Sequence, residues 1–130
     1  MSRFLVDTQL LLWNAEGSHR LPARVARLFR DGRHEFFASV ASIWEVAIKA
    51  AQGRRPFPVS AARMRENLSG NGFHELAVTG AHAIAVENLP ALHGDPFDRL
   101  LIAQALVEPM VLITTDARLG AYPGNIEVIE

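Results

Sequence analysis

Short apolar runs recur along the chain and alternate with segments of helical periodicity, and this alternation constrains the fold more than any other feature. The clearest run, Met110-Val111-Leu112-Ile113-Thr114, is continuously apolar and does not alternate with polar residues. A strand of this kind is buried on both faces, which is typical of a parallel sheet covered by helices. We therefore expect an α/β fold with a central parallel sheet covered on both faces.

The predicted elements alternate along the whole chain. We expect strands at 4–6, 35–38, 73–78, 110–114 and 126–129. We expect helices at 8–15, 21–31, 60–69, 80–88 and 96–107, a helix that is capped by Ser39 or Ser42 and runs to Gly53, and a short helical turn after Asp116. We find no repeat or interdomain linker, so residues 1–130 are expected to form a single domain.

Composition excludes several classes of function. The net charge is −1, so no overall basic field attracts nucleic acid or a membrane. The chain has no cysteine, which excludes zinc–thiolate sites and cysteine nucleophiles. No apolar run approaches the roughly 20 residues of a membrane helix, and the first residues carry no signal-peptide pattern. We expect a soluble, cytoplasmic protein that does not bind a membrane.

Four acidic residues stand in otherwise apolar segments, where a carboxylate is costly unless something compensates its charge. They are Asp7, Glu45, Asp98 and Asp116, called the four acids below. Each also has a local structural explanation. Asp7 and Asp116 can cap the helices that follow them. Glu45 can close a capping box with Ser42 or pair with Lys49 one turn later.

The negative charge of Asp98 can be explained by the start of a helix, but it conflicts with the apolar residues that follow it. Asp95 and Pro96 predict a helix start, with Asp95 as the N-cap, and the helix dipole then favours a negative charge at Asp98. However, Asp98 stands three and four residues before Leu101 and Ile102, at the head of the apolar stripe. Its carboxylate should therefore lean toward the core and needs compensation.

The four acids are expected to converge at one edge of the sheet, because two of them follow strands and two lie on flanking helices. Clustered carboxylates repel one another, so without a metal they should be crowded, hydrated or paired with a substitute cation. An all-oxygen ligand set selects a hard cation such as Mg²⁺ or Mn²⁺, and such a site suits phosphodiester hydrolysis by a metal-activated water. The bordering residues that can orient a water or a carboxylate are Thr8, Thr114 and Thr115.

Four motifs occur in order along the chain, and the resemblance that they carry covers essentially all of it. They are Phe4-Leu5-Val6-Asp7-Thr8, Ser42-Ile43-Trp44-Glu45-Val46-Ala47-Ile48-Lys49, His93-Gly94-Asp95-Pro96-Phe97-Asp98-Arg99-Leu100-Leu101-Ile102-Ala103-Gln104-Ala105 and Leu112-Ile113-Thr114-Thr115-Asp116. Together they resemble the PIN-domain family, and specifically the toxin ribonucleases of VapBC-type toxin–antitoxin pairs. The third motif is the most specific of the four.

The resemblance implies a three-layer α/β/α domain and a Mg²⁺- or Mn²⁺-dependent endoribonuclease. The residues that match the family's three strongest acidic positions are Asp7, Glu45 and Asp98, and the residue at a fourth, more variable position is Asp116. Asp95 matches an acid common in this subgroup, and Thr114 matches the threonine beside the fourth acid. Gln9 departs from the histidine that often follows Asp-Thr in close relatives, which puts little in doubt.

The resemblance also implies partners, namely an RNA substrate, a second copy of the chain and a small antitoxin through which DNA is bound indirectly. Leu11, Leu12 and Trp13 could contribute either to those partner surfaces or to the core. Trp44, like Trp13, is predicted to be a core or interface residue and not a base-stacking platform. The candidates for contact with RNA or with a partner are Arg54, Arg55 and Arg99.

Several other functions fit the sequence less well. A phosphate-transfer receiver domain needs a second acid near Asp7 and a late lysine, whereas Lys49 is the only lysine. A haloacid-dehalogenase-like phosphatase needs a second aspartate two residues after Asp7, where Gln9 stands. A PIN nuclease without an antitoxin remains an alternative, and so does a silent nucleic-acid-binding module, although the intact acids disfavour the latter.

Overall fold

The computed structural model describes residues 2–53, 59–92 and 94–130. Within these residues five strands form one sheet: β1 (Arg3–Val6), β2 (Glu35–Ser39), β3 (His74–Leu76), β4 (Val111–Thr114) and β5 (Ile126–Val128). Their order is β3-β2-β1-β4-β5, and every neighbouring pair is parallel. The expected parallel sheet is therefore confirmed.

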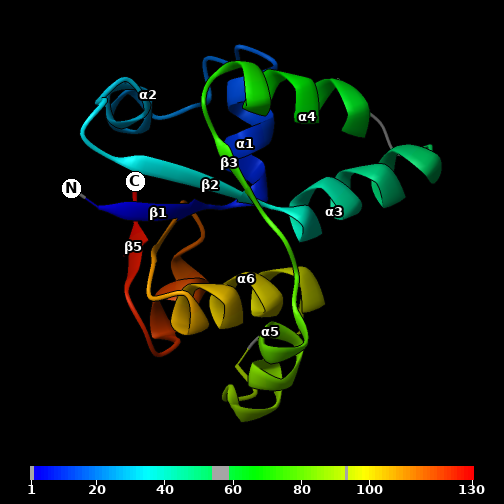
Figure 1. Cartoon of the computed structure of the whole chain (residues 1–130), viewed down its shortest axis with the longest axis vertical. Helices are drawn as coiled ribbons and strands as arrows, with labels where there is room; N and C mark the ends of the chain where they lie inside the picture. Colours follow the sequence, from blue (N-terminus) through cyan, green and yellow to red (C-terminus); the bar gives the residue numbers. More distant parts are fainter. Residues whose placement is uncertain (1, 54–58, 93) are drawn as a thin grey trace.

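Helices cover both faces of the sheet (Figure 1). One face carries α1 (Thr8–Ala15), α2 (Ala23–Phe29), α3 (Val40–Ala51) and α4 (Ala61–Gly70), and the other carries α5 (Gly80–Ala85) and α6 (Pro96–Val107). Side chains of β1 alternate between two apolar clusters, with Phe4 and Val6 in the first and Leu5 in the second. This arrangement confirms the three-layer α/β/α fold.

Several predicted elements are longer than the observed ones; the helix expected at 21–31, for example, is α2 (Ala23–Phe29), which begins after Pro22. The strand expected at 73–78 is shorter, because β3 lies at the edge of the sheet and pairs with β2 alone. The helix expected at 80–88 ends with α5 and continues as a 3-10 turn, η1 (Val86–Asn88). Pro90 disfavours helical geometry at the residue before it, which limits how far the helix can extend.

The structure decides two alternatives that the sequence leaves open. Ser39 caps α3, because its hydroxyl accepts a hydrogen bond from the backbone N–H of Ala41 at 3.0 Å. Leu11 is fully buried and belongs to the core, and Leu12 and Trp13 pack partly buried against the same apolar cluster, so a partner surface stays a prediction for these two. Among the described helices, none has the length and apolar character needed to cross a membrane.

The order of the strands places a switch point at the centre of the sheet. From β1 the chain proceeds to β2 and β3 on one side, and β4 and β5 lie on the other side. In open parallel sheets, ligands bind outside the carboxyl ends of the strands at such a point. Asp7 directly follows β1, and Asp116 lies two residues beyond β4, so both acids stand at this edge.

Candidate active site

Asp7 caps α1 and faces the site at the same time. Its Oδ1 accepts a hydrogen bond from the backbone N–H of Gln9 at 3.3 Å, and its Oδ2 accepts one from the hydroxyl of Thr114. Burial raises the pKa of Asp7 above its ordinary value, while the hydrogen bonds from Thr114 and Gln9 act in the opposite direction. Asp7 can therefore cap α1 and also contribute to the site, because each of its two carboxylate oxygens has its own partner.

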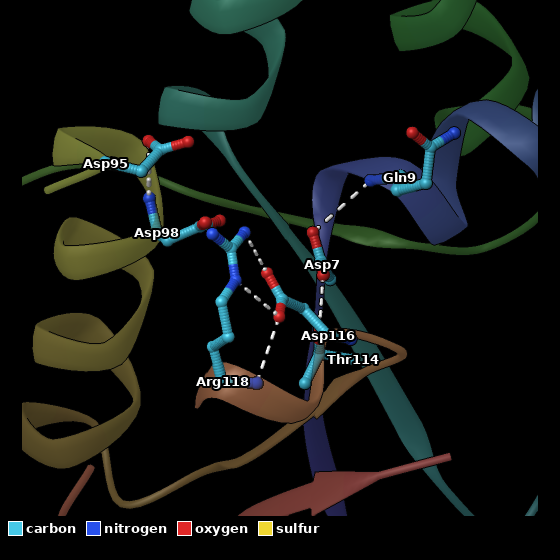
Figure 2. A network of polar contacts seen from close by, with 7 residues as sticks. All are labelled: Asp7, Gln9, Asp95, Asp98, Thr114, Asp116 and Arg118. Carbon is cyan, nitrogen blue, oxygen red and sulfur yellow. Dashed lines mark hydrogen bonds and ion pairs between the residues drawn. The ribbon is translucent and has the colours of Figure 1, made fainter. Parts of the chain in front are cut away.

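Asp116 is held by the side chain of Arg118, a contact that was not predicted from the sequence and that we call the Arg118 clamp. Its Oδ1 accepts from the backbone N–H and the Nε of Arg118, both at 3.0 Å, and its Oδ2 accepts from Nη2 at 2.8 Å. Figure 2 shows the Arg118 guanidinium between Asp116 and Asp98. The same three bonds join Asp31 and Arg33, so an Asp-x-Arg spacing at a turn was the available signal.

Asp98 enters the site from the first turn of α6. Asp95 caps this helix by accepting from the backbone N–H groups of Phe97 at 2.8 Å and Asp98 at 3.3 Å, as expected. Burial raises the pKa of Asp98 to about 7, and the charges of Asp7, Asp95 and the other acids add to the effect. Figure 2 shows the Asp98 side chain directed toward Arg118 and Asp116.

Glu45 reaches the site from α3 and is almost completely buried, with 6% of its surface exposed. Its Oε2 pairs with Nζ of Lys49 at 2.5 Å, which is one of the two expected local arrangements. The other, a capping box with Ser42, does not form, because Ser39 caps α3 and Ser42 accepts from the Thr8 hydroxyl at 2.7 Å. Glu45 Oε1 is buried without a hydrogen-bond partner among the described residues.

The four acids line one cavity of about 240 Å³, together with Asp95 and Lys49. We call this cavity the acid pocket. Thr8 and Thr115 also border it, whereas Thr114 acts through its bond to Asp7. A larger cavity of about 790 Å³, bordered by α4 and β3, contains none of the four acids. The convergence of four acids from distant parts of the chain therefore distinguishes the smaller cavity.

The chemical type of the potential ligand atoms in the acid pocket suits a hard divalent cation. The four acids offer only oxygens, and Glu45 Oε1 is a buried acceptor that has no hydrogen-bond partner among the described residues. In residues 2–53, 59–92 and 94–130, however, no three acidic or histidine side chains form a group that could hold a metal as they stand. Glu45 and Asp116 are instead paired with Lys49 and Arg118, which agrees with the expectation of substitute cations.

The three predicted contact arginines have different outcomes. Arg99 binds other residues of the same chain. Its Nη1 donates hydrogen bonds to the carbonyl of Pro90 at 2.8 Å and to the hydroxyl of Tyr122 at 3.2 Å. It does not border the acid pocket. Arg54 and Arg55 lie outside the described residues.

Comparison with known proteins identifies the family of the chain. Residues 4–125 match the model of the PIN domain. A chain of the VapBC2 complex from Rickettsia felis, bound to a DNA fragment from its promoter, is 12% identical with a TM-score of 0.73, and the match covers 97% of this chain and 98% of that one. Among curated proteins none matches the sequence.

Two further solved structures share the fold. A chain of DNA-bound VapBC from Salmonella typhimurium is 16% identical with a TM-score of 0.69, over 98% of each chain. A chain of a toxin–antitoxin complex from Klebsiella pneumoniae is 18% identical with a TM-score of 0.64, over 95% of each chain. At these identities the likeness concerns the fold alone.

Proposed function

This chain belongs to the PIN domain family, and from that premise we propose that it is a divalent-metal-dependent endoribonuclease and the toxin of a toxin–antitoxin module. The observation that carries the proposal is the convergence of the four acids on one pocket at the switch point of the sheet. These acids come from four different elements, so local capping alone gives no reason for them to meet.

The four acids are the groups that would hold Mg²⁺ or Mn²⁺. A bound metal supplies an activated water and neutralises charge on the phosphate. The protein's own contribution is placement: the Thr114 hydroxyl orients Asp7, and the Asp95 cap fixes the helical turn that carries Asp98. Lys49 and Arg118 neutralise two acids in the free protein and leave cations beside the phosphate.

The proposed partners follow from the structural neighbours. Two neighbours are VapBC complexes with DNA, and a third is a toxin–antitoxin complex. These neighbours support a small antitoxin as the partner of this chain, with DNA bound only through it, and we include the homodimer and the RNA substrate in the proposal.

Cleavage of RNA by the purified chain tests the enzymatic part of the proposal. We expect cleavage with Mg²⁺ or Mn²⁺, its loss with a chelator, and a decrease of at least about 100-fold in Asp7→Asn and Asp98→Asn. Asp31→Asn is the matched control, because Asp31 lies outside the acid pocket. Cleavage by the wild type that is no faster than by the two pocket variants contradicts the proposal.

Expression in cells tests the toxin part. We expect growth arrest that is relieved by co-expression of the small gene immediately upstream. An active nuclease that causes no arrest would instead be a PIN nuclease without an antitoxin, and a chain that binds RNA without cutting it would be a silent binding module.

A further inference from the structure

A partly exposed aromatic pair joins the two helices that carry Glu45 and Asp98, and neither ring belongs to the lining of the acid pocket. Trp44 is 59% exposed, although a tryptophan side chain gains a large free energy from burial. Its ring contacts that of Phe97, with centroids 5.4 Å apart and planes at 68°. Of the two predicted positions for Trp44, core or interface, the core is wrong and the interface stays a prediction, whereas Trp13 does pack against the core.

The position of the pair follows from its neighbours in sequence. Trp44 directly precedes Glu45 on α3, and Phe97 directly precedes Asp98 on α6. Successive residues of a helix point about 100° apart, so a helix that turns Glu45 into the pocket presents Trp44 beside it. Because Trp44 contacts Phe97, the pair bridges the two helices that carry these acids.

The chemistry around the pair favours one kind of ligand. An aromatic surface next to a pocket whose carboxylates would hold a metal suits a ligand with a flat apolar face and an adjacent anionic group. Lys49 and Arg118 add positive charge that such an anion can use. A nucleotide has both parts, since one sugar joins its base to its phosphate, whereas an apolar side chain of a protein partner has no anionic group.

We propose that Trp44, supported by its T-shaped contact with Phe97, is the surface on which a nucleobase of the RNA stacks beside the phosphate that is cut. This inference rests on the proposed function and assigns Trp44 a substrate-positioning role within it. Stacking on an aromatic ring tolerates every base, so the contact contributes affinity and placement more than sequence selection.

The first experiment uses the intrinsic fluorescence of Trp44. The full chain carrying Asp98→Asn, for which the proposed function predicts at least about 100-fold slower cleavage, is titrated with a single-stranded RNA 12-mer in Mn²⁺. We expect the fluorescence of Trp44 to be quenched, and the quenching to saturate over the same RNA concentrations as the binding of a labelled 12-mer. Inorganic polyphosphate, which carries charge without bases, should cause no quenching. In the same background, Trp44→Phe should remove most of the quenching and Trp13→Phe should retain it.

Affinity and kinetics provide the second readout. Loss of one stacked base corresponds to roughly 5- to 100-fold weaker binding, which we expect for Trp44→Leu, whereas Trp44→Phe keeps a ring and should lose less than about threefold. In the active chain, Trp44→Leu should raise KM and leave kcat within about threefold. Because Trp44 is exposed, both variants should keep the melting temperature of the wild type.

The outcomes separate this inference from the proposed function. Quenching by RNA in a wild-type chain that never cuts RNA would overturn the proposed function and retain the stacking surface. Cleavage with an unchanged KM in Trp44→Leu, or quenching that persists in Trp44→Phe, would overturn the stacking surface alone. If Trp44→Leu leaves RNA binding intact but changes the oligomeric state, the pair is a protein interface and the inference fails.

Discussion

Replacing Asp98 by asparagine is expected to stabilise the metal-free protein at alkaline pH and to leave its stability unchanged near pH 4. Below about pH 4 the carboxyl is protonated in both the folded and the unfolded chain. Between pH 4 and 7 the unfolded chain releases this proton, while the folded protein retains it because the pKa of Asp98 is about 7. The free energy of unfolding therefore falls as the pH rises through this window. Asparagine cannot ionise, so the variant avoids that loss.

The magnitude follows from the environment of Asp98. A rise in pKa from 3.8 to about 7 corresponds to an upper limit of about 4 kcal/mol. The side chain is only half-buried, so solvent screens much of the interaction, and we expect about 1–2 kcal/mol. For a chain of this length the variant should melt roughly 3–8 °C above the wild type at pH 8.

Thermal melts in a chelator at pH 5 and pH 8 provide the assay. Asp31→Asn is the control, because Arg33 holds the pKa of Asp31 well below its usual range and gives asparagine no such advantage. A second arm adds Mn²⁺, which should stabilise the wild type by up to about 3 kcal/mol at 100 times its dissociation constant and reverse the order of the two melting temperatures. An identical difference between wild type and Asp98→Asn at both pH values would refute the reasoning.

Three further substitutions test other contacts of the site and the fold. Lys49→Met leaves Glu45 buried without its cation and should lower the free energy of unfolding by about 1–3 kcal/mol in a chelator, with recovery in Mn²⁺, as measured by thermal melts. Arg118→Gln releases Asp116 from the guanidinium and should tighten Mn²⁺ binding by up to about fivefold in calorimetry; an unchanged or weaker affinity would show that the clamp does not compete with metal. His82→Ala removes a fully buried ring that is hydrogen-bonded at both nitrogens and should cost about 2–4 kcal/mol in urea denaturation.

Elements with local start and stop signals were predictable from sequence. The helix that follows Asp7 and the helix capped by Asp95 have the expected bounds, because a cap acts within one turn of the residue that supplies it. The parallel sheet was predictable because continuous apolar runs need cover on both faces. β3 was less predictable, since an edge strand ends where its one neighbour stops pairing with it.

Contacts between distant segments could not be predicted. The bond from Thr8 to Ser42 depends on how α1 and α3 approach each other, which no local pattern encodes. The same holds for the buried Oε1 of Glu45, which has no partner among the residues that the structure describes. The exposure of Trp44 has the same origin, because apolar spacing does not say whether a neighbouring helix covers a ring or only touches its edge. The metal that would compensate Asp98 stays a prediction.

The position of β1 at the centre of the sheet makes the acid pocket depend on segments that are far apart in the order of translation. Asp7 is translated 107 residues before its partner Thr114, and the clamped Asp116 follows Thr114. A nascent or truncated chain without β4 lacks the strand that pairs with β1 on that side and cannot assemble the pocket. Under the proposed function, a translation product that stops before β4 has no nuclease activity, because it lacks the strand beside β1 and the residues that follow it.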